Sequence, residues 1–237
     1  WEKHFENFRV YVPFTKESGF KGIVLTSWST SGEYGYEWEI YGDVLDMLPI
    51  RRVYPLSGYR MLLAAHIEAV KSKTPLNTKA FVVRYAQERF GLNSRQALLF
   101  QKALWLNETL LQPKTPKKDR EIAFEAAVKT SRILHALKPI RNVKELSHFI
   151  LMADLRELST KWRRTEATIN SKDFTPAQVP AAVKKLTTLI KESKKQDRRF
   201  VQLNKDSLYP QQLEEEIAYR NKKMMMIYQR LSRVGRK

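Results

Sequence analysis

The sequence predicts a mostly α-helical chain, in which one α/β unit near the N-terminus is followed by an antiparallel helical bundle. Six of the eight glycines precede residue 60, so turns are concentrated in the first third of the chain. Residues 1–75 carry nine basic and nine acidic side chains, whereas residues 76–237 carry 34 and 16, so the net charge of +18 belongs to the second part. Both changes coincide near Pro75 and predict two domains, residues 1–75 and 76–237.

The first unit predicts a helix, a strand, a long loop and a second helix. Residues 4–16 are expected to be helical, although Pro13 interrupts the pattern. Residues 22–28 form a continuous β-branched apolar run between turn residues, which indicates a strand buried on both faces, as in a parallel sheet. A loop follows to about Gly42, and a helix is expected from Ser57, as its N-cap, to Lys71. Loops that follow parallel strands are where α/β proteins place their sites.

The second unit predicts a succession of amphipathic helices joined by short polar turns, which pack as an antiparallel bundle. Capping residues or prolines mark their starts, and glycine or proline follows several of their ends. In the last helix the apolar residues are spaced alternately by four and three, a heptad seam with one break at Arg220. The predicted helices cover residues 77–90, 93–111, 119–137 and 143–170, and two more begin near residues 175 and 209.

Several classes of function are excluded. The chain has no cysteine, so a disulfide framework, a cysteine zinc site and a thiol nucleophile are ruled out. Its four histidines are scattered, and neither a glycine-rich phosphate loop nor a G-x-S-x-G motif occurs, so no metal or cofactor is predicted. No apolar run exceeds five residues, against the roughly 20 that a membrane-spanning helix needs. The start at Trp1 has no signal-peptide pattern, and the chain is expected to be processed or part of a longer protein.

The densest cluster of chemically informative side chains is the loop of residues 28–39. It holds two tryptophans, two tyrosines and three glutamates in twelve residues. Aromatic rings stack on the C–H faces of sugars, and carboxylates accept hydrogen bonds from sugar hydroxyls, so the composition favours a sugar site as much as a structured surface loop. Spacing alone does not indicate a catalytic carboxylate pair within the loop. The candidate substrate-binding residues are Trp28, Glu33, Tyr36, Trp38 and Glu39.

Three stretches, residues 19–32, 55–69 and 81–91, resemble the end of a family-20 glycoside hydrolase of the bacterial β-N-acetylhexosaminidase type. The resemblance covers roughly residues 1–91. It implies that residues 1–75 supply the last strand, loop and helix of a (β/α)8 catalytic barrel, and that the basic all-α domain of residues 76–237 follows. In that family the last strand ends in a tryptophan that forms one wall of the sugar pocket, and Trp28 matches it.

The chain departs from this family at two points. The family has Gly-Glu after the tryptophan, whereas Ser29 and Thr30 stand here, and Glu33 is the nearest carboxylate. The family's catalytic Asp-Glu pair belongs to the fourth strand, which this chain does not contain. The resemblance therefore implies the C-terminal portion of a glycoside hydrolase, without a complete catalytic site of its own. It also implies an N-acetylhexosamine-containing glycan as partner and a periplasmic or extracellular bacterial location.

The basic second unit supports two other hypotheses. Positive charge concentrated in helices is the electrostatic pattern of polyanion binding. However, the charges are spread over most exposed faces, and no helix-turn-helix or RNA-recognition motif accompanies them, so weak binding is expected. The alternative function is thus a basic helical module that binds nucleic acid or another polyanion. The heptad seam favours a third hypothesis, an assembly module whose last helix pairs with a partner or a second copy.

Overall fold

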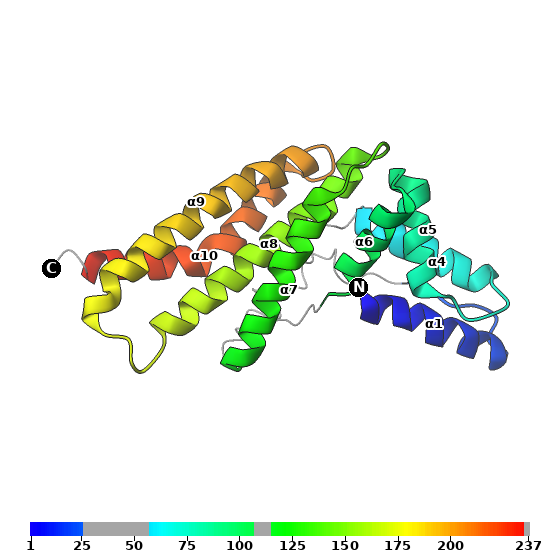
Figure 1. The fold of residues 1–237 in the computed structure, drawn as a ribbon, viewed down its shortest axis with the longest axis horizontal. Coiled ribbons are helices and arrows are strands. Elements are labelled where there is room, and N and C mark those ends of the chain that lie inside the picture. The colour runs from blue at the N-terminus through cyan, green and yellow to red at the C-terminus, as the bar shows by residue number, and fades with distance from the viewer. Residues whose placement is uncertain (26–56, 107–114, 235–237) are drawn as a thin grey trace.

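The computed structural model describes residues 1–25, 57–106 and 115–234, and within these ranges the chain is helical, without a strand (Figure 1). The prediction of a mostly α chain is confirmed. The predicted strand is not seen where it can be compared: residues 22–25 have no strand partner among the described residues, and Val24 is 84% exposed. A strand needs a neighbour to pair with, and the described residues supply none, so no unit of a (β/α)8 barrel is seen. Residues 26–56, with the predicted loop, lie outside the described residues.

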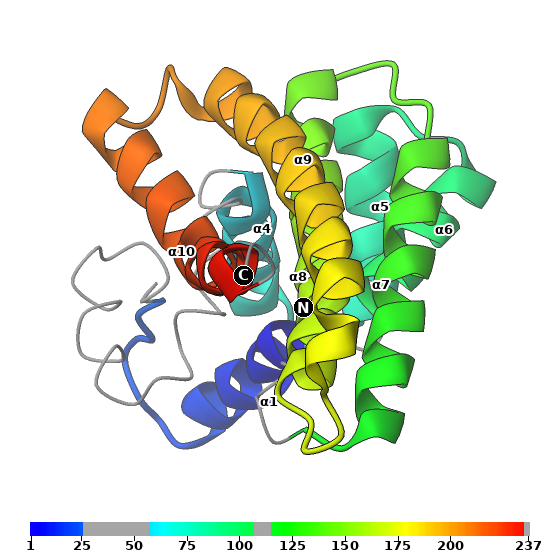
Figure 2. The ribbon, with the colours of Figure 1, turned by 90° about the vertical axis from the view of Figure 1, so that its left-hand side faces the viewer.

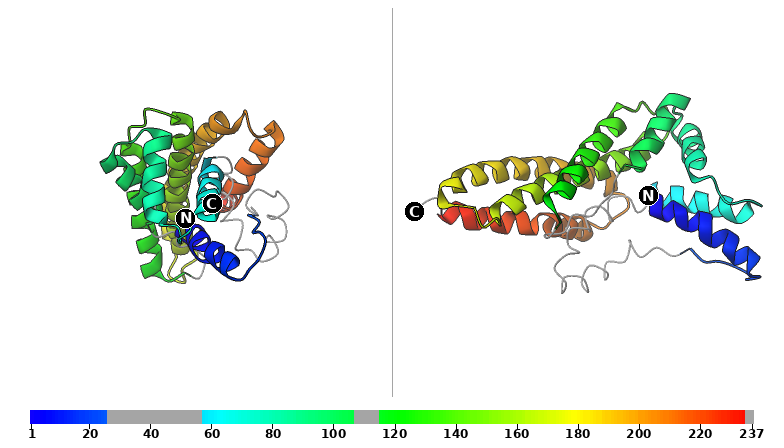
Figure 3. Two further views of the ribbon diagram at one scale, coloured as in Figure 1. Left: turned by 90° about the vertical axis from the view of Figure 1, so that its right-hand side faces the viewer. Right: turned by 60° about the horizontal axis from the view of Figure 1, so that its bottom comes forward.

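Two helices from the N-terminal part of the chain lie side by side at one end of the molecule (Figures 1 and 3). Helix α1 (Glu2–Glu17) contains Pro13 without ending there, and α4 (Ser57–Lys71) has the predicted bounds. The ammonium group of Lys16, in the last turn of α1, donates to the carbonyl oxygens of Ala69 at 3.1 Å and Ser72 at 2.7 Å. This side chain ties the C-terminal ends of the two helices together.

The next two helices begin where the sequence predicts, and the first of them also ends there. Asn77 caps α5 (Thr78–Phe90) by accepting from the backbone N–H of Ala80, and Asn93 caps α6 (Ser94–Leu104) in the same way. Gly91 ends α5 with φ of +65°, and a Cβ there would lie 2.3 Å from Cγ1 of Ile140, so both backbone conformation and space require glycine. Helix α6 ends earlier than predicted, at Leu104.

The four longer helices form the body of the molecule (Figure 2). Helix α7 packs on α8, α8 on α9, and α9 on α10, as short connections in a bundle require. A capping box between Thr175 and Gln178 starts the short helix η2 (Pro176–Gln178), which leads directly into α9. The predicted helices are confirmed to within a few residues. They are α7 (Lys117–Ala136), α8 (Val143–Ile169), α9 (Val179–Asn204) and α10 (Pro210–Val234).

One apolar core extends through every α-helix from α1 to α10. At its centre the ring of Phe149 lies 5.4 Å from that of Trp1, 6.1 Å from Phe90 and 5.3 Å from Phe100. Side chains from before and after residue 75 therefore share this core, and the assignment of a domain to either side of that residue stays a prediction. A smaller second core joins the far ends of α8, α9 and α10, and comprises Leu158, Trp162, Leu186, Leu189 and Met224.

The heptad seam of α10 is used within the chain. Leu213 is buried in the larger core and Met224 in the smaller one, while Ile227 and Leu231 pack against the latter. These contacts attach α10 to α9 and α8. The seam is therefore occupied by neighbouring helices of the same chain.

Candidate functional site

The residues predicted to bind sugar lie outside the described residues. Trp28, Glu33, Tyr36, Trp38 and Glu39 all belong to residues 26–56. The sugar site they were predicted to form stays a prediction. The structure does describe the parts of the chain on either side of this segment, which are α1 with residues 18–25 before it and α4 after it.

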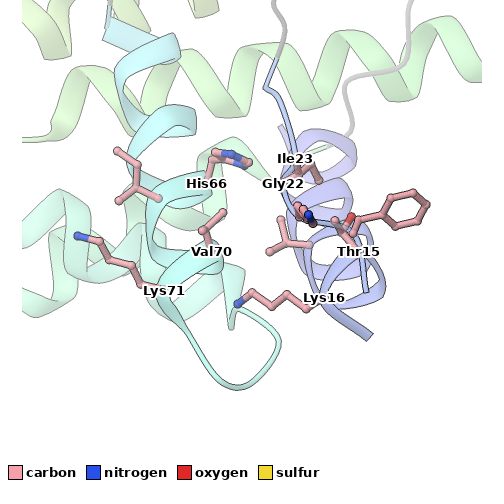
Figure 4. Close-up of a pocket in the computed structure, with 11 residues that line it drawn as sticks. Thr15, Lys16, Gly22, Ile23, His66, Val70 and Lys71 are labelled. Atoms are coloured by element: carbon pink, nitrogen blue, oxygen red, sulfur yellow. The ribbon is translucent and has the colours of Figure 1, made fainter. Parts of the chain in front are cut away.

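A pocket of about 510 Å³ opens between α1, α4 and the residues that follow α1 (Figure 4). Apolar side chains form most of its wall, among them Phe20, Ile23 and Val70. Its polar side chains are those of Thr15, Lys16, Lys21, His66 and Lys71. The Lys16 ammonium donates to the carbonyl oxygens of Ala69 and Ser72, and Nδ1 of His66 is buried without a hydrogen-bond partner among the described residues. None of the described lining residues is a carboxylate.

Helices α1 and α4 are apolar on two sides. Their inner sides enter the core, where Phe5 and Met61 are fully buried. Helices with apolar residues on opposite sides are usually buried on both, so a further layer is expected to cover the outer side. We call this outer surface the α1–α4 face; it comprises Val10, Tyr11, Phe14, Phe20, Val24, Leu63, Ile67 and Val70, each more than 40% exposed.

A buried serine–histidine pair joins α4 to α8. The Ser57 hydroxyl lies 2.6 Å from Nδ1 of His148, and Nε2 of His148 lies 3.3 Å from the carbonyl oxygen of Leu203. Because that carbonyl can only accept, Nε2 carries the proton and Nδ1 accepts from Ser57. Ser57, predicted as the N-cap of α4, thus bonds to a residue 91 positions away. It is 2% exposed, so a substrate has no access to the hydroxyl, and the pair fixes α4 in place.

The His148 pair predicts a stability change with pH. Burial lowers the pKa of His148 below its ordinary value of 6.5; Lys144 also lowers it, while the Leu203 carbonyl and Glu145 act in the opposite direction. The unfolded chain therefore binds this proton more readily than the folded one, so stability is full above pH 6.5 and falls as the pH drops through the lowered pKa. Thermal melts at pH 7.5 and 5.5 should show a smaller pH-dependent loss in His148→Gln than in the wild type. An equal loss in both proteins would contradict this role of His148.

A second polar cluster surrounds the buried carboxylate of Asp154. Ser131 donates to it at 2.8 Å, Nε2 of His135 lies 2.9 Å from it, and Arg199 forms an ion pair with it. In a nucleophilic triad the histidine stands between serine and carboxylate, whereas here both side chains bond to the same carboxylate. The cluster therefore neutralises and satisfies a buried acid. Sequence reasoning missed it, although Ser131 and His135 stand four residues apart on one predicted helix face.

Other ion pairs, between or within the long helices, also place acidic groups inside the bundle. Arg220, the break in the heptad seam, lies 2.6 Å from the Asp197 carboxylate. Glu166 pairs with Arg163 at 2.5 Å and with Lys223 at 2.7 Å. Each of these acids is matched by at least one cation, so the pairs inside the bundle leave the net positive charge of the chain in place.

Comparisons of the chain with protein-family models, with curated proteins and with solved structures find no match. Among the described residues, no three or more His, Asp or Glu side chains are grouped as a metal site would require. No helix in the described ranges has the length and apolar character needed to cross a membrane.

Proposed function

We propose that the chain is the C-terminal portion of a carbohydrate-active glycoside hydrolase resembling β-N-acetylhexosaminidases. The observation that carries this proposal is the two-sided apolar character of α1 and α4. In a (β/α)8 barrel, a helix of the outer ring packs on the strands with one side. If a helical domain lies against its other side, that helix needs two apolar sides. The α1–α4 face and the open pocket beside it supply the side that the strands would cover.

The resemblance supplies the sugar chemistry. In this proposal Trp28 forms one wall of the sugar pocket of the parent enzyme, where its ring stacks on a pyranose. Tyr36 and Trp38 add aromatic surface, and Glu33 and Glu39 accept hydrogen bonds from hydroxyl groups. The acid that protonates the leaving oxygen and the carboxylate that polarises the acetamide come from another part of the barrel. Helices α5 to α10 act as an accessory domain that supports the last unit of the barrel.

The role of Trp28 is tested in a longer protein that also supplies the preceding barrel strands. Trp28→Ala should lower kcat/KM for an aryl β-N-acetylhexosaminide by roughly 5- to 150-fold, the equivalent of about 1–3 kcal/mol for one pocket wall. Tyr209→Ala is the control, because Tyr209 is an exposed aromatic residue at the start of α10. An unchanged kcat/KM in Trp28→Ala would remove this residue from the site. The 237-residue chain alone should show no turnover, and robust turnover would refute the proposal.

A further inference from the structure

Helix α9 presents a stripe of positive charge to solvent. Lys184, Lys191, Lys195 and Arg198 are exposed, and none of them forms an ion pair within the ranges that the structure describes. Their spacings of seven, four and three residues place them on one side of the helix, over a length of about 21 Å. We call these four residues the α9 stripe. It gathers four of the outward-facing charges into one line.

Helix α7 provides an internal comparison with the α9 stripe. It carries Lys118, Lys129 and Arg132 at the same spacings as Lys184, Lys195 and Arg198. All three are exposed, but Glu125 occupies the position that corresponds to Lys191, and it is exposed as well. The α7 surface is therefore of mixed sign where the α9 stripe is wholly positive, although three cations stand at matching spacings on the two helices.

We propose that the α9 stripe binds an acidic polysaccharide, a linear glycan that carries sulfate or carboxylate groups. The exposed residues of α9 from Ala181 to Arg198 are alanine, threonine, lysine and arginine alone. They offer no ring for stacking a nucleotide base, no amide for reading a base edge and no large apolar side chain for insertion into a membrane. The mode of recognition that these side chains do allow is binding to a linear polymer by its charge. The choice of a glycan among such polymers rests on the proposed function.

The test measures heparin binding to the 237-residue chain at 0.15 M salt by isothermal titration calorimetry. The triple variant Lys184→Gln, Lys195→Gln, Arg198→Gln should bind about tenfold more weakly or worse, because three ionic contacts and their counterion release are lost. The matched variant Lys118→Gln, Lys129→Gln, Arg132→Gln removes the same charge and should lose less than about threefold. The charge-retaining variant Lys184→Arg, Lys195→Arg should bind like the wild type. Thermal melts confirm that each variant is folded.

Further probes identify the anionic group and the class of polymer. Dextran sulfate carries only sulfate groups and polyuronate only carboxylates, so comparing the two identifies the anionic group that is bound. Neutral dextran should not bind. Equal weakening of the α9 and α7 variants would overturn the stripe as the site. Tighter binding to duplex DNA than to heparin at the same salt would overturn a glycan as its occupant. If Trp28→Ala leaves kcat/KM unchanged while the α9 variant still binds heparin more weakly, only the proposed function is rejected, because heparin binding does not report on hydrolysis.

Discussion

Replacing Phe149 by alanine should lower the free energy of unfolding by about 3–5 kcal/mol, the range for large aromatic truncations in a packed core. Phe149 is fully buried in the second turn of α8, and its ring contacts those of Trp1, Phe90 and Phe100. These three residues come from the N-terminus, α5 and α6. Because the surrounding helices are held by several other contacts, they cannot collapse fully into the space, and a cavity is left.

Urea denaturation of the 237-residue chain measures this loss. Phe14→Ala is the matched control, since Phe14 is 60% exposed on the α1–α4 face and should change stability by less than about 0.5 kcal/mol. A loss in Phe149→Ala no larger than in Phe14→Ala would contradict the shared core. The same comparison probes the proposed function, because Phe14→Ala should become destabilising once preceding barrel strands cover the α1–α4 face.

Local signals in the sequence predicted most of the helical fold. Asn77, Gly91, Asn93 and the Thr175 capping box act within one turn of chain, so each marks a helix end without knowledge of the tertiary structure. The strand expected at residues 22–28 depends on neighbours, and pairing of this kind cannot be read from one run of apolar residues. The composition of the run is that of a buried strand, whereas Val24 is exposed in the structure.

The polar contacts of the molecule were less predictable than its helices. Ser57 and His148 stand 91 residues apart, and no spacing rule links them. Ser131 and His135 share a helix face, so their proximity was readable, but the carboxylate that joins them comes from α8. The charge pattern of the sequence predicts cations spread over most exposed faces, whereas in the structure some cations, such as Arg220, pair with acids inside the bundle and the α9 stripe lies outside. The packing of the helices decides which charges form pairs. The periodicity of a single helix carries no information about that packing.

Asp197→Ala should lower the free energy of unfolding by about 3–5 kcal/mol, because it leaves a buried cation without its partner. The Asp197 carboxylate accepts from the Arg220 guanidinium at 2.6 Å and from the Asn221 amide at 2.9 Å. Arg220 is nearly inaccessible to water, and its guanidinium lies 4.9 Å from the centre of the Phe200 ring. Water therefore cannot replace the lost carboxylate, and the cost falls on the contact between α9 and α10.

Two further variants separate this effect from a general loss of charge. Asp206→Ala removes an acid from the exposed pair with Lys144 and should cost far less stability than Asp197→Ala. The double variant Asp197→Leu, Arg220→Met removes both buried charges and should recover most of the stability, since Nη1 of Arg220 already lacks a hydrogen-bond partner among the described residues. If the double variant is as unstable as Asp197→Ala, the loss comes from packing and not from the stranded charge. If it recovers, Arg220 breaks the heptad seam at a cost that only Asp197 offsets, which explains why α10 tolerates an arginine in its apolar face.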